Sequence, residues 1–430
     1  MMTPRKRQNS QGFLLIMSMI YAFLIMAFLA SFLVMVTGGL RQANRAVDRT
    51  RAYYVADAGL ASALAQLRAA AALPAAFNIA PTSYPVGPNN LNGSYSVAIT
   101  TDGASTPTYT LASTGTFGSA RKTLTLRIKT SSFSRWNYLS RTEIHPTWGT
   151  LWWVTGMYAE GNIHTDGQFN IWGSPIYNGP TSQVAPTLNY GQGGPPNDNP
   201  NFQQGLTLSA PSITFPTTEL LDSVKNGAAQ ASGVSLTGTT TVTLVSDGTM
   251  KVTNSAKGWN AQSMAIPANG ALYVNNGDVT VQGTLKGQLT IATNQNLLIG
   301  GNVLYKTDPM TTPSSTDILG LVANTAVTVK QTAPSNLRID GYIVALNDSF
   351  QLENFSVGGF KGNMIQYGGL MNKFCGPTGV MDWSGNIIDG YNQLQYYDTR
   401  FKTASPPFFT AAKEEGTNRV IYSKVDLKET

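Results

Sequence analysis

The side chains best suited to metal chemistry gather in one short stretch of the chain. Both histidines, His145 and His164, lie there, and two imidazoles with a carboxylate can bind a transition metal. The stretch has no H-E-x-x-H pair or other fixed ligand spacing of zinc sites. We therefore expect no metal and interpret His164 as a hydrogen-bonded turn residue. The carboxylates of this candidate set are Glu143, Glu160 and Asp166.

A second group of polar residues has the types needed for acid–base catalysis. Cleavage of a polysaccharide needs carboxylates and a base that converge on one face. The candidates are Asp340, Asp348, Glu353 and Lys361. Because no spacing brings them together, we expect no catalytic residue, no cofactor and no enzyme.

Aromatic residues crowd the region around the histidines, and we interpret them as core residues or a binding platform. They are Trp136, Trp148, Trp152, Trp153 and Trp172.

The elements that position these residues are predicted to be strands. Only 12% of the residues are charged, and 42 glycines and 22 prolines supply many turns, as in a β-rich exported protein. From residue 272 to 346, short apolar-polar-apolar segments alternate with Gly and Asn corners, which favours a β-solenoid. The irregular spacing leaves an antiparallel sandwich as the alternative. A short helix is expected after Pro216, with Leu220, Leu221 and Val224 buried.

The N-terminal segment has a different character. Residues 13–36 carry no charge, and roughly 20 apolar residues cross a bilayer core. Arg5, Lys6 and Arg7 precede them and favour a cytoplasmic N-terminus. A plain single-pass anchor is the simplest interpretation. A cleaved secretory signal would have a shorter apolar core of about 7–15 residues.

Beyond a loosened joint predicted at Gly38-Gly39, the helix is expected to become amphipathic. One apolar face has helical spacing, whereas Arg41, Asp48, Arg51, Ser62 and Gln66 are expected to point away. The residues of that face are Tyr53, Ala56, Leu60, Ala63, Leu64 and Leu67.

Two motifs carry a family resemblance. Gln11-Gly12-Phe13-Leu14-Leu15 resembles the cleavage region of type IV prepilins, and residues 52–60 (AYYVADAGL), followed by Ala63-Leu64, resemble the signature of PilX-type minor pilins. The resemblance implies that prepilin peptidase cuts after Gly12 and that Phe13 becomes a methylated N-terminus. It also implies a helix-packing motif, whose residues are Tyr53, Tyr54, Ala56, Asp57, Gly59, Leu60, Leu64 and Leu67.

Two positions depart from the family pattern. Asp57 stands where the signature has Glu and keeps the carboxylate. Met17 stands where pilins usually carry a Glu that pairs with a neighbouring subunit's amino terminus. A carboxylate in the membrane is costly and persists only for a purpose. Its absence resembles the K-type pseudopilin at a filament tip and argues for a minor rather than a major pilin.

The expected fold class is α+β: a long transmembrane and amphipathic helix packed on a small antiparallel sheet, followed by a large β-solenoid-like domain. The expected sheet strands include Tyr95-Val97-Ile99, Tyr109-Leu111 and Leu124-Leu126-Ile128. Residues 159–167, 389–391, 396–400 and 406–409 resemble a poorly characterised β-rich domain of pilus-associated proteins. The predicted segments are a leader (1–12), the pilin helix (13–72), a linker and small sheet (73–132, the linker covering 73–93), the β-rich domain (133–411) and a C-terminal edge strand or loose tail (412–430).

The function implied by the resemblance is structural. We expect a minor pilin or pseudopilin of a type IV pilus or type II secretion-like filament, at its tip or in assembly initiation. Its expected partners are the bacterial inner membrane, other pilin subunits, prepilin peptidase and a surface glycan or other host or abiotic surface. The net charge of +6 falls to +3 without Arg5, Lys6 and Arg7, so no nucleic-acid surface is expected. The alternative is a membrane-tethered glycan-binding protein or polysaccharide-active enzyme.

Overall fold

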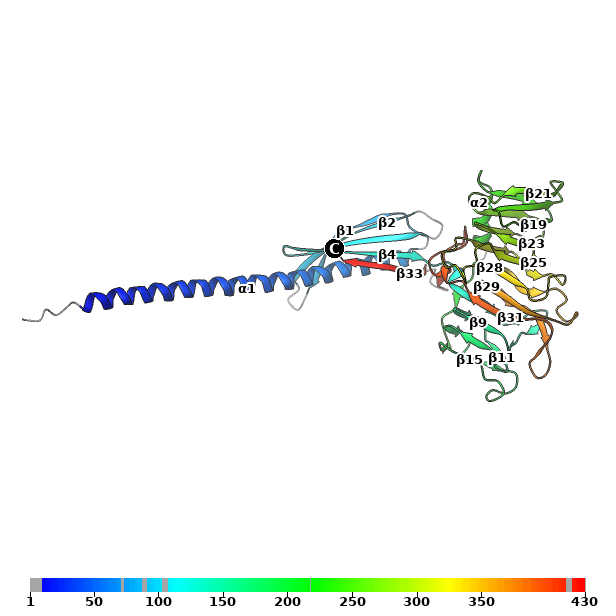
Figure 1. The fold of residues 1–430 in the computed structure, drawn as a ribbon, viewed down its shortest axis with the longest axis horizontal. Coiled ribbons are helices and arrows are strands. Elements are labelled where there is room, and N and C mark those ends of the chain that lie inside the picture. The colour runs from blue at the N-terminus through cyan, green and yellow to red at the C-terminus, as the bar shows by residue number, and fades with distance from the viewer. Residues whose placement is uncertain are drawn as a thin grey trace, which may run out of the picture.

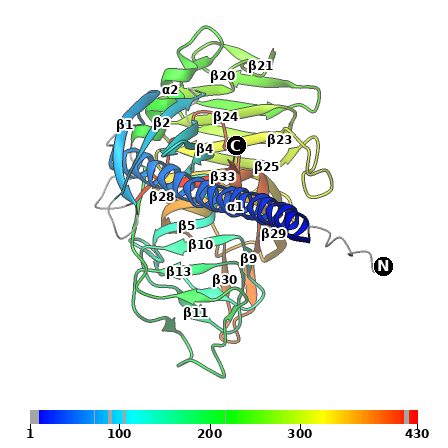
Figure 2. The same ribbon diagram turned by 90° about the vertical axis from the view of Figure 1, so that its left-hand side faces the viewer.

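The computed structural model describes residues 10–70, 73–86, 91–102, 107–216, 218–414 and 420–429. A long helix, α1 (Ser10–Ala69), forms a rod with a small sheet on its C-terminal half. A stack of short strands lies beyond that sheet and extends to both sides of the helix axis (Figure 1, Figure 2). The predicted α+β class, with a long apolar helix, an antiparallel sheet and a large β-rich domain, is confirmed.

Helix α1 is continuous over 60 residues. The predicted loosened joint at Gly38-Gly39 is wrong, because both residues are helical with no break beside them. Glycine costs only about 1 kcal/mol relative to alanine in a helix interior, so two glycines do not interrupt a helix of this length. Residues 1–9 of the predicted leader, and residues 71 and 72 of the predicted helix, lie outside the described residues.

The small sheet is antiparallel and packs on the C-terminal half of α1. Its strand order is β1-β2-β3-β4-β33, and it includes the three strands predicted for it between residues 94 and 130. The apolar alternation of those strands faces the helix, with Val97, Leu111 and Leu124 buried. The strands are β1 (Phe77–Val86), β2 (Leu91–Thr101), β3 (Thr108–Phe117), β4 (Ala120–Thr130) and β33 (Tyr422–Glu429).

Strand β1 corrects the prediction that residues 73–93 form only a linker or wrapped loop. It pairs with β2 in spite of Pro81 and Pro85. A proline removes one backbone donor, and an edge strand needs only half of its donors for the sheet. The register shifts between Ile79 and Thr82, next to Pro81. An edge position therefore accommodates residues that sequence patterns assign to a loop.

The C-terminus returns to the small sheet. Strand β33 pairs antiparallel with β4, for example Leu427 with Leu126, which confirms an edge strand among the predicted alternatives for residues 412–430. The large β-rich domain is thus inserted between the fourth and fifth strands of the small sheet. Its chain enters after β4 through η1 (Phe133–Arg135) and leaves through η2 (Thr399–Lys402).

The inserted domain consists mainly of parallel strands that stack coil upon coil, in two rows, with antiparallel pairs at β19–β20–β21 and β30–β31. We call residues 136–214 and 234–397 the coil stack. One row runs β18-β22-β24-β26-β28-β29-β5-β10-β13-β16. The other runs β19-β23-β25-β28-β29-β31-β9-β12-β15. Parallel pairing across successive coils closes the backbone hydrogen bonds that a single coil cannot satisfy.

Between residues 272 and 346 the strands of the stack follow the predicted apolar segments. The first part of the stack has β5 (Trp136–Thr142), β9 (Tyr158–Glu160), β10 (Asn162–Thr165), β12 (Ile176–Asn178), β13 (Thr181–Gln183), β15 (Asn201–Phe202) and β16 (Leu206–Thr207). The second part has β18 (Val234–Thr237), β19 (Thr240–Leu244), β20 (Thr249–Asn254), β21 (Trp259–Ala265), β22 (Ala271–Asn275), β23 (Val279–Leu285), β24 (Gln288–Thr293), β25 (Leu297–Tyr305), β26 (Ile318–Ala323), β27 (Val327–Val329), β28 (Arg338–Leu352), β29 (Phe360–Cys375), β30 (Gly379–Met381) and β31 (Ile387–Tyr397). Short strands beside the rows are β6 (Ile144–His145), β7 (Gly149–Thr150), β8 (Trp153–Val154), β11 (Asn170–Trp172), β14 (Asn189–Tyr190), β17 (Ile213–Thr214) and β32 (Lys413–Glu414).

The coils do not stack in chain order. Strand β5, the first of the stack, pairs with β29, near its end, so that Leu139 lies beside Met371. The first coils continue from β5 toward one end, and the chain then passes to the other end through α2 (Thr218–Ala228). Entry and exit of the chain therefore both lie in the middle of the stack, next to the small sheet.

Helix α2 covers a face at the far end of the stack. Leu220, Leu221 and Val224 are buried, as predicted, in a cluster with Tyr273 and Phe409. The interior of the coils forms a separate and larger cluster of aliphatic side chains. The coil stack thus has a core independent of the one between α1 and the small sheet.

Candidate functional site

The N-terminal half of α1 is uncovered. An 18-residue window there has a mean hydropathy of 2.6, and none of it is buried. Phe13 is 66% exposed and Phe28 is 72% exposed. This single apolar helix is compatible with a single-pass membrane anchor. Gly12 lies in the same helix, and a Cβ added to it would meet no atom within 4 Å.

The C-terminal half of α1 buries the predicted apolar face. Ala56, Leu60, Ala63 and Leu67 are fully or almost fully buried against the sheet. Tyr53 and Leu64 are partly buried at the margin of the same cluster. The predicted face did not include Ala52 and Val55, which are both fully buried and whose spacing from Gly59 could have identified them.

Helix and sheet approach most closely at two glycines. A Cβ on Gly115 of β3 would lie 2.3 Å from the Ala52 carbonyl oxygen and 2.3 Å from the Ala56 nitrogen. A Cβ on Gly59 would lie 2.3 Å from Ser113 Oγ, whose hydroxyl donates a 2.7 Å hydrogen bond to the Ala56 carbonyl. Glycine at both positions therefore lets the two backbones come together.

Two residues of the packing motif face away from the sheet. Tyr54 is 60% exposed and meets the ring of Tyr53 edge-on at 5.7 Å. Asp57 is also exposed. Packing within this chain therefore accounts for Ala56, Gly59, Leu60 and Leu67 of the motif, but not for these two.

The sheet also contacts residues that were expected to point away from it. Arg51 lies over the ring of Phe117, with its guanidinium carbon 4.9 Å from the ring centre. Asp48 lies 3.8 Å from the Arg51 guanidinium. Arg51 and Asp48 are half-buried, so contact with the sheet begins earlier along the helix than predicted, because the end of β3 reaches Arg51.

A buried carboxylate lies in the first coil. Glu143 is fully buried and accepts hydrogen bonds from Tyr138 OH at 3.0 Å, from Trp153 Nε1 at 3.2 Å and from the Ser140 hydroxyl. Desolvation raises the pKa of Glu143, and these donors partly oppose the rise. The group is consistent with a structural polar centre that ties β5 to the segment of Trp153.

The two histidines are held in separate places. His145 Nδ1 accepts a hydrogen bond from the Thr147 backbone N–H, and its Nε2 lies 3.0 Å from Asp348. His164 contacts Ser182 and Asp166. The prediction that His164 is hydrogen-bonded is correct, but it lies in strand β10 and not in a turn.

The carboxylates considered as metal ligands do not gather around the two histidines either. Glu160 accepts a hydrogen bond from the Tyr397 backbone N–H, away from both histidines. Within the described part of the chain, no three His, Cys, Asp or Glu residues are grouped as a metal site requires.

Asp340 belongs to a network of ion pairs. Its carboxylate is 1% exposed and accepts from Arg338 Nε at 2.7 Å and from the Tyr305 backbone N–H at 2.9 Å. Arg338 also contacts Asp308 at 2.8 Å. Desolvation raises the pKa of Asp340, against the effect of Arg338.

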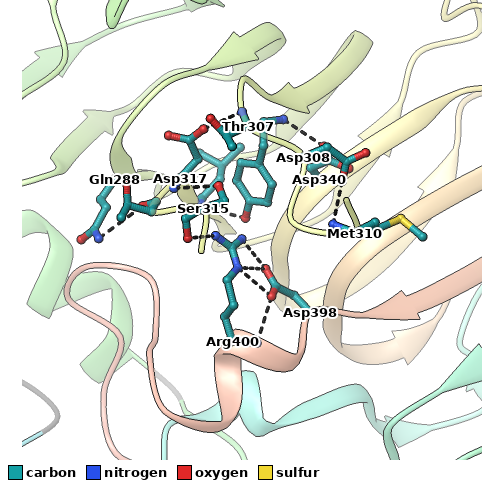
Figure 3. A network of polar contacts seen from close by, with 12 residues as sticks. Gln288, Thr307, Asp308, Met310, Ser315, Asp317, Asp340, Asp398 and Arg400 are labelled. Carbon is teal, nitrogen blue, oxygen red and sulfur yellow. Dashed lines mark hydrogen bonds and ion pairs between the residues drawn. The ribbon is translucent and has the colours of Figure 1, made fainter. Parts of the chain in front are cut away.

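Figure 3 shows how the same region joins η2 to the loop after β25. Arg400 contacts Asp398 at 2.6 Å and donates to the Ser315 carbonyl at 2.7 Å. Asp317 accepts from the Thr307 backbone N–H. These contacts fix residues 306–317 against the stack, so their evident role is structural.

The other candidate catalytic residues have partners of their own. Asp348 lies beside His145. Glu353 accepts a hydrogen bond from the Gln331 backbone N–H at 2.9 Å, and Lys361 Nζ donates one to the Gln331 carbonyl oxygen at 2.6 Å. The four candidates thus take part in three different sets of contacts.

The clustered tryptophans divide between core and surface. Trp136 and Trp153 are buried, whereas Trp148 is 49% exposed. Trp152 and Trp172 are half-buried and meet edge-on at 5.6 Å. Trp383, at the turn between β30 and β31, is 87% exposed and lies 6.3 Å from Trp172. The predicted core role is therefore observed for Trp136 and Trp153, and a binding platform stays a prediction for the exposed rings.

Comparison with known proteins gives limited similarity. No protein-family model matches the chain, and no curated protein matches it. A solved structure that is similar is the competence-associated pilin ComZ from Thermus thermophilus, at 11% sequence identity and a TM-score of 0.36. That match covers 89% of this chain and 98% of ComZ. The function proposed below therefore rests on the exposure and contacts of this chain's own residues.

Proposed function

We propose that this protein is a minor pilin or pseudopilin, a structural subunit of a type IV pilus or type II secretion-like filament. The observation that carries the proposal is the division of α1 into two halves. The first half is apolar and uncovered, whereas the second half is buried on a five-stranded sheet that the C-terminus completes. The exposed apolar surface of the N-terminal half of α1 is therefore available to pack against the corresponding helices of other subunits.

The uncovered half of α1 lies in two environments, one before and one after filament assembly. It spans the inner membrane before assembly and packs against the apolar helices of other subunits afterwards. Helices in lipid associate through van der Waals contacts rather than a hydrophobic driving force. Exposed Phe23, Phe28 and Leu33 supply such contacts. The exposed motif residues Tyr54 and Asp57 are then available to neighbouring subunits.

We place the subunit at the filament tip or in the initiating complex. The coil stack lies beyond the C-terminal end of α1 and on both sides of its axis (Figure 1), where it would obstruct a subunit stacked above. Met17 lacks the carboxylate that would pair with the amino terminus of such a subunit. The coil stack, with exposed Trp148 and Trp383, would contact a surface glycan or another host or abiotic surface.

The proposal gives the coil stack no catalytic role. The carboxylates considered for catalysis already bind Arg338, His145 and the Gln331 backbone. A membrane-tethered glycan-binding protein or polysaccharide-active enzyme is the alternative. It requires no filament and no cleavage after Gly12.

The test is the mature N-terminus in cells with and without prepilin peptidase. We expect mass spectrometry to find a methylated Phe13 at the N-terminus only when the peptidase is present. Gly12→Val should block cleavage, because a β-branched side chain replaces the small residue before the cut.

Gly38→Val is the matched control for Gly12→Val, since neither glycine has a neighbour within 4 Å of an added Cβ. It should be cleaved normally. An intact leader on the wild-type protein in cells that contain the peptidase would exclude the pilin function.

A further inference from the structure

A cavity of about 280 Å³ lies in the coil stack, where the segment of residues 148–157 covers β29 and the β30–β31 hairpin. Its walls are mainly aromatic and aliphatic. Trp148 and Phe355 meet edge-on at 5.1 Å on one side. Its apolar lining includes Trp148, Trp153, Phe350, Phe355, Leu370 and Ile387.

The cavity lining is electrically neutral. Among the described residues that line it, none is Asp, Glu, Lys or Arg. Transfer of an ion into such a site would cost its hydration without a compensating charge. The cavity therefore favours a neutral molecule.

Several polar groups of the lining already have partners. Tyr138 OH donates to Glu143, and Tyr391 OH donates to the Pro334 carbonyl at 2.7 Å. Gln393 Nε2 donates to Gln366. These groups hold the walls in place and leave little polarity for a ligand.

Asn372 is the exception among the described lining residues that have buried side-chain N or O atoms. Its side chain is 1% exposed, and its Oδ1 has no hydrogen-bond partner. It lines the cavity together with Leu370, two residues earlier on β29 and on the same face of the strand. A buried acceptor without a donor is unfavourable, so a molecule in the cavity would gain from supplying one.

We propose that this cavity binds a small neutral molecule with an apolar ring and one N–H or O–H donor, which pairs with Asn372 Oδ1. A single water satisfies the site poorly, because a buried water needs two to four polar partners. The ring lies against Trp148, Trp153 and Phe355, where aromatic contacts are favourable. This binding function is independent of the role of α1 in a filament.

The first test compares two probes of the same shape. 5-Fluoroindole has an N–H donor, whereas 5-fluorobenzothiophene has sulfur at that position. Binding to the full chain in lipid nanodiscs is measured by fluorine NMR, with empty nanodiscs as the blank. We expect the wild-type protein to bind the indole about tenfold more tightly, the effect of one hydrogen bond to a buried acceptor.

The second test uses variants of the cavity. Asn372→Leu should remove the preference for the indole and retain binding of the benzothiophene. Val380→Trp, in the half-buried strand β30, should fill the cavity and abolish binding of both probes. Asn137→Leu is the matched control, since Asn137 is also 1% exposed with an unpartnered Oδ1 but does not line the cavity. It should bind both probes as the wild type does.

Three results would overturn the proposal. They are equal affinity of the wild type for the two probes, binding of neither probe, and undiminished binding by a folded Val380→Trp variant. Binding of neither probe would favour an apolar side chain of a partner protein as the occupant. All of these results leave cleavage after Gly12 unaffected, so failure here is distinct from failure of the pilin proposal.

Discussion

Gly115→Ala should separate α1 from the sheet, because the added methyl group meets helix backbone and not a movable side chain. The new Cβ would lie 2.3 Å from Ala52 O and from Ala56 N, so the helix must retreat by roughly 1 Å to reach ordinary contact distance. Such overpacking costs about 1–3 kcal/mol. Weakening the Ser113–Ala56 hydrogen bond adds about 1 kcal/mol. Alanine loses less backbone entropy on folding than glycine does, which offsets the loss of stability by about 0.5–1 kcal/mol.

The net loss is about 1–3 kcal/mol, which corresponds to roughly 5- to 150-fold faster amide exchange by local opening. Hydrogen–deuterium exchange of the full chain in nanodiscs should show this change in peptides from β3 and from residues 52–67 of α1. Ala112→Ser also adds one atom to β3, but on the face opposite Gly115, and should stay within about twofold. Equal exchange in the two variants would refute the close approach of helix and sheet.

Three further predictions concern the helix and the coil stack. Leu60→Asp should destabilise the folded subunit by several kcal/mol and so lower its abundance in quantitative immunoblots. Ala61→Asp, on the exposed side of the helix, should leave abundance unchanged, and an equal loss in both variants would show that the buried face is wrongly assigned. Met17→Glu should not improve filament assembly counted by electron microscopy, because a tip subunit offers that carboxylate no amino terminus; improved assembly would indicate an ordinary subunit. Burial raises the pKa of Glu143, so its folded state binds a proton more tightly and its contribution to stability falls as pH rises above about 4.3. The stability advantage of the wild type over Glu143→Gln in denaturant titrations should therefore shrink from pH 4 to pH 7, and a growing advantage would contradict the assignment.

The parts of this fold that local sequence patterns could predict are those whose burial has a fixed period. Val97 and Ile99 alternate with polar residues, and their strand pairs as expected. Leu60 and Leu67 recur at helical spacing, and both are buried. In the stack, the segments between Gly and Asn corners are strands because β-branched and aliphatic residues suit both the pleat and the core.

Other features depended on distant parts of the chain. Pairing of Leu139 with Met371 reverses the order of the coils, and no local pattern encodes such a pairing. Strand β1 was missed because its prolines are acceptable only at a sheet edge. The burial of Glu143 depends on donors from two chain segments, Tyr138 and Trp153. Gly115 did carry a usable signal, since a glycine inside a strand often marks a close backbone approach.

The central claim is that the uncovered half of α1 packs against other filament subunits. The most direct test is site-specific photo-crosslinking with benzoylphenylalanine at Phe28, 72% exposed, and at Leu60, 4% exposed, in cells that assemble filaments. We predict that the probe at Phe28 captures the N-terminal helix of another pilin-like subunit, and that the probe at Leu60 captures only the sheet of its own chain. Capture of lipid alone at Phe28 in assembled filaments would contradict the claim.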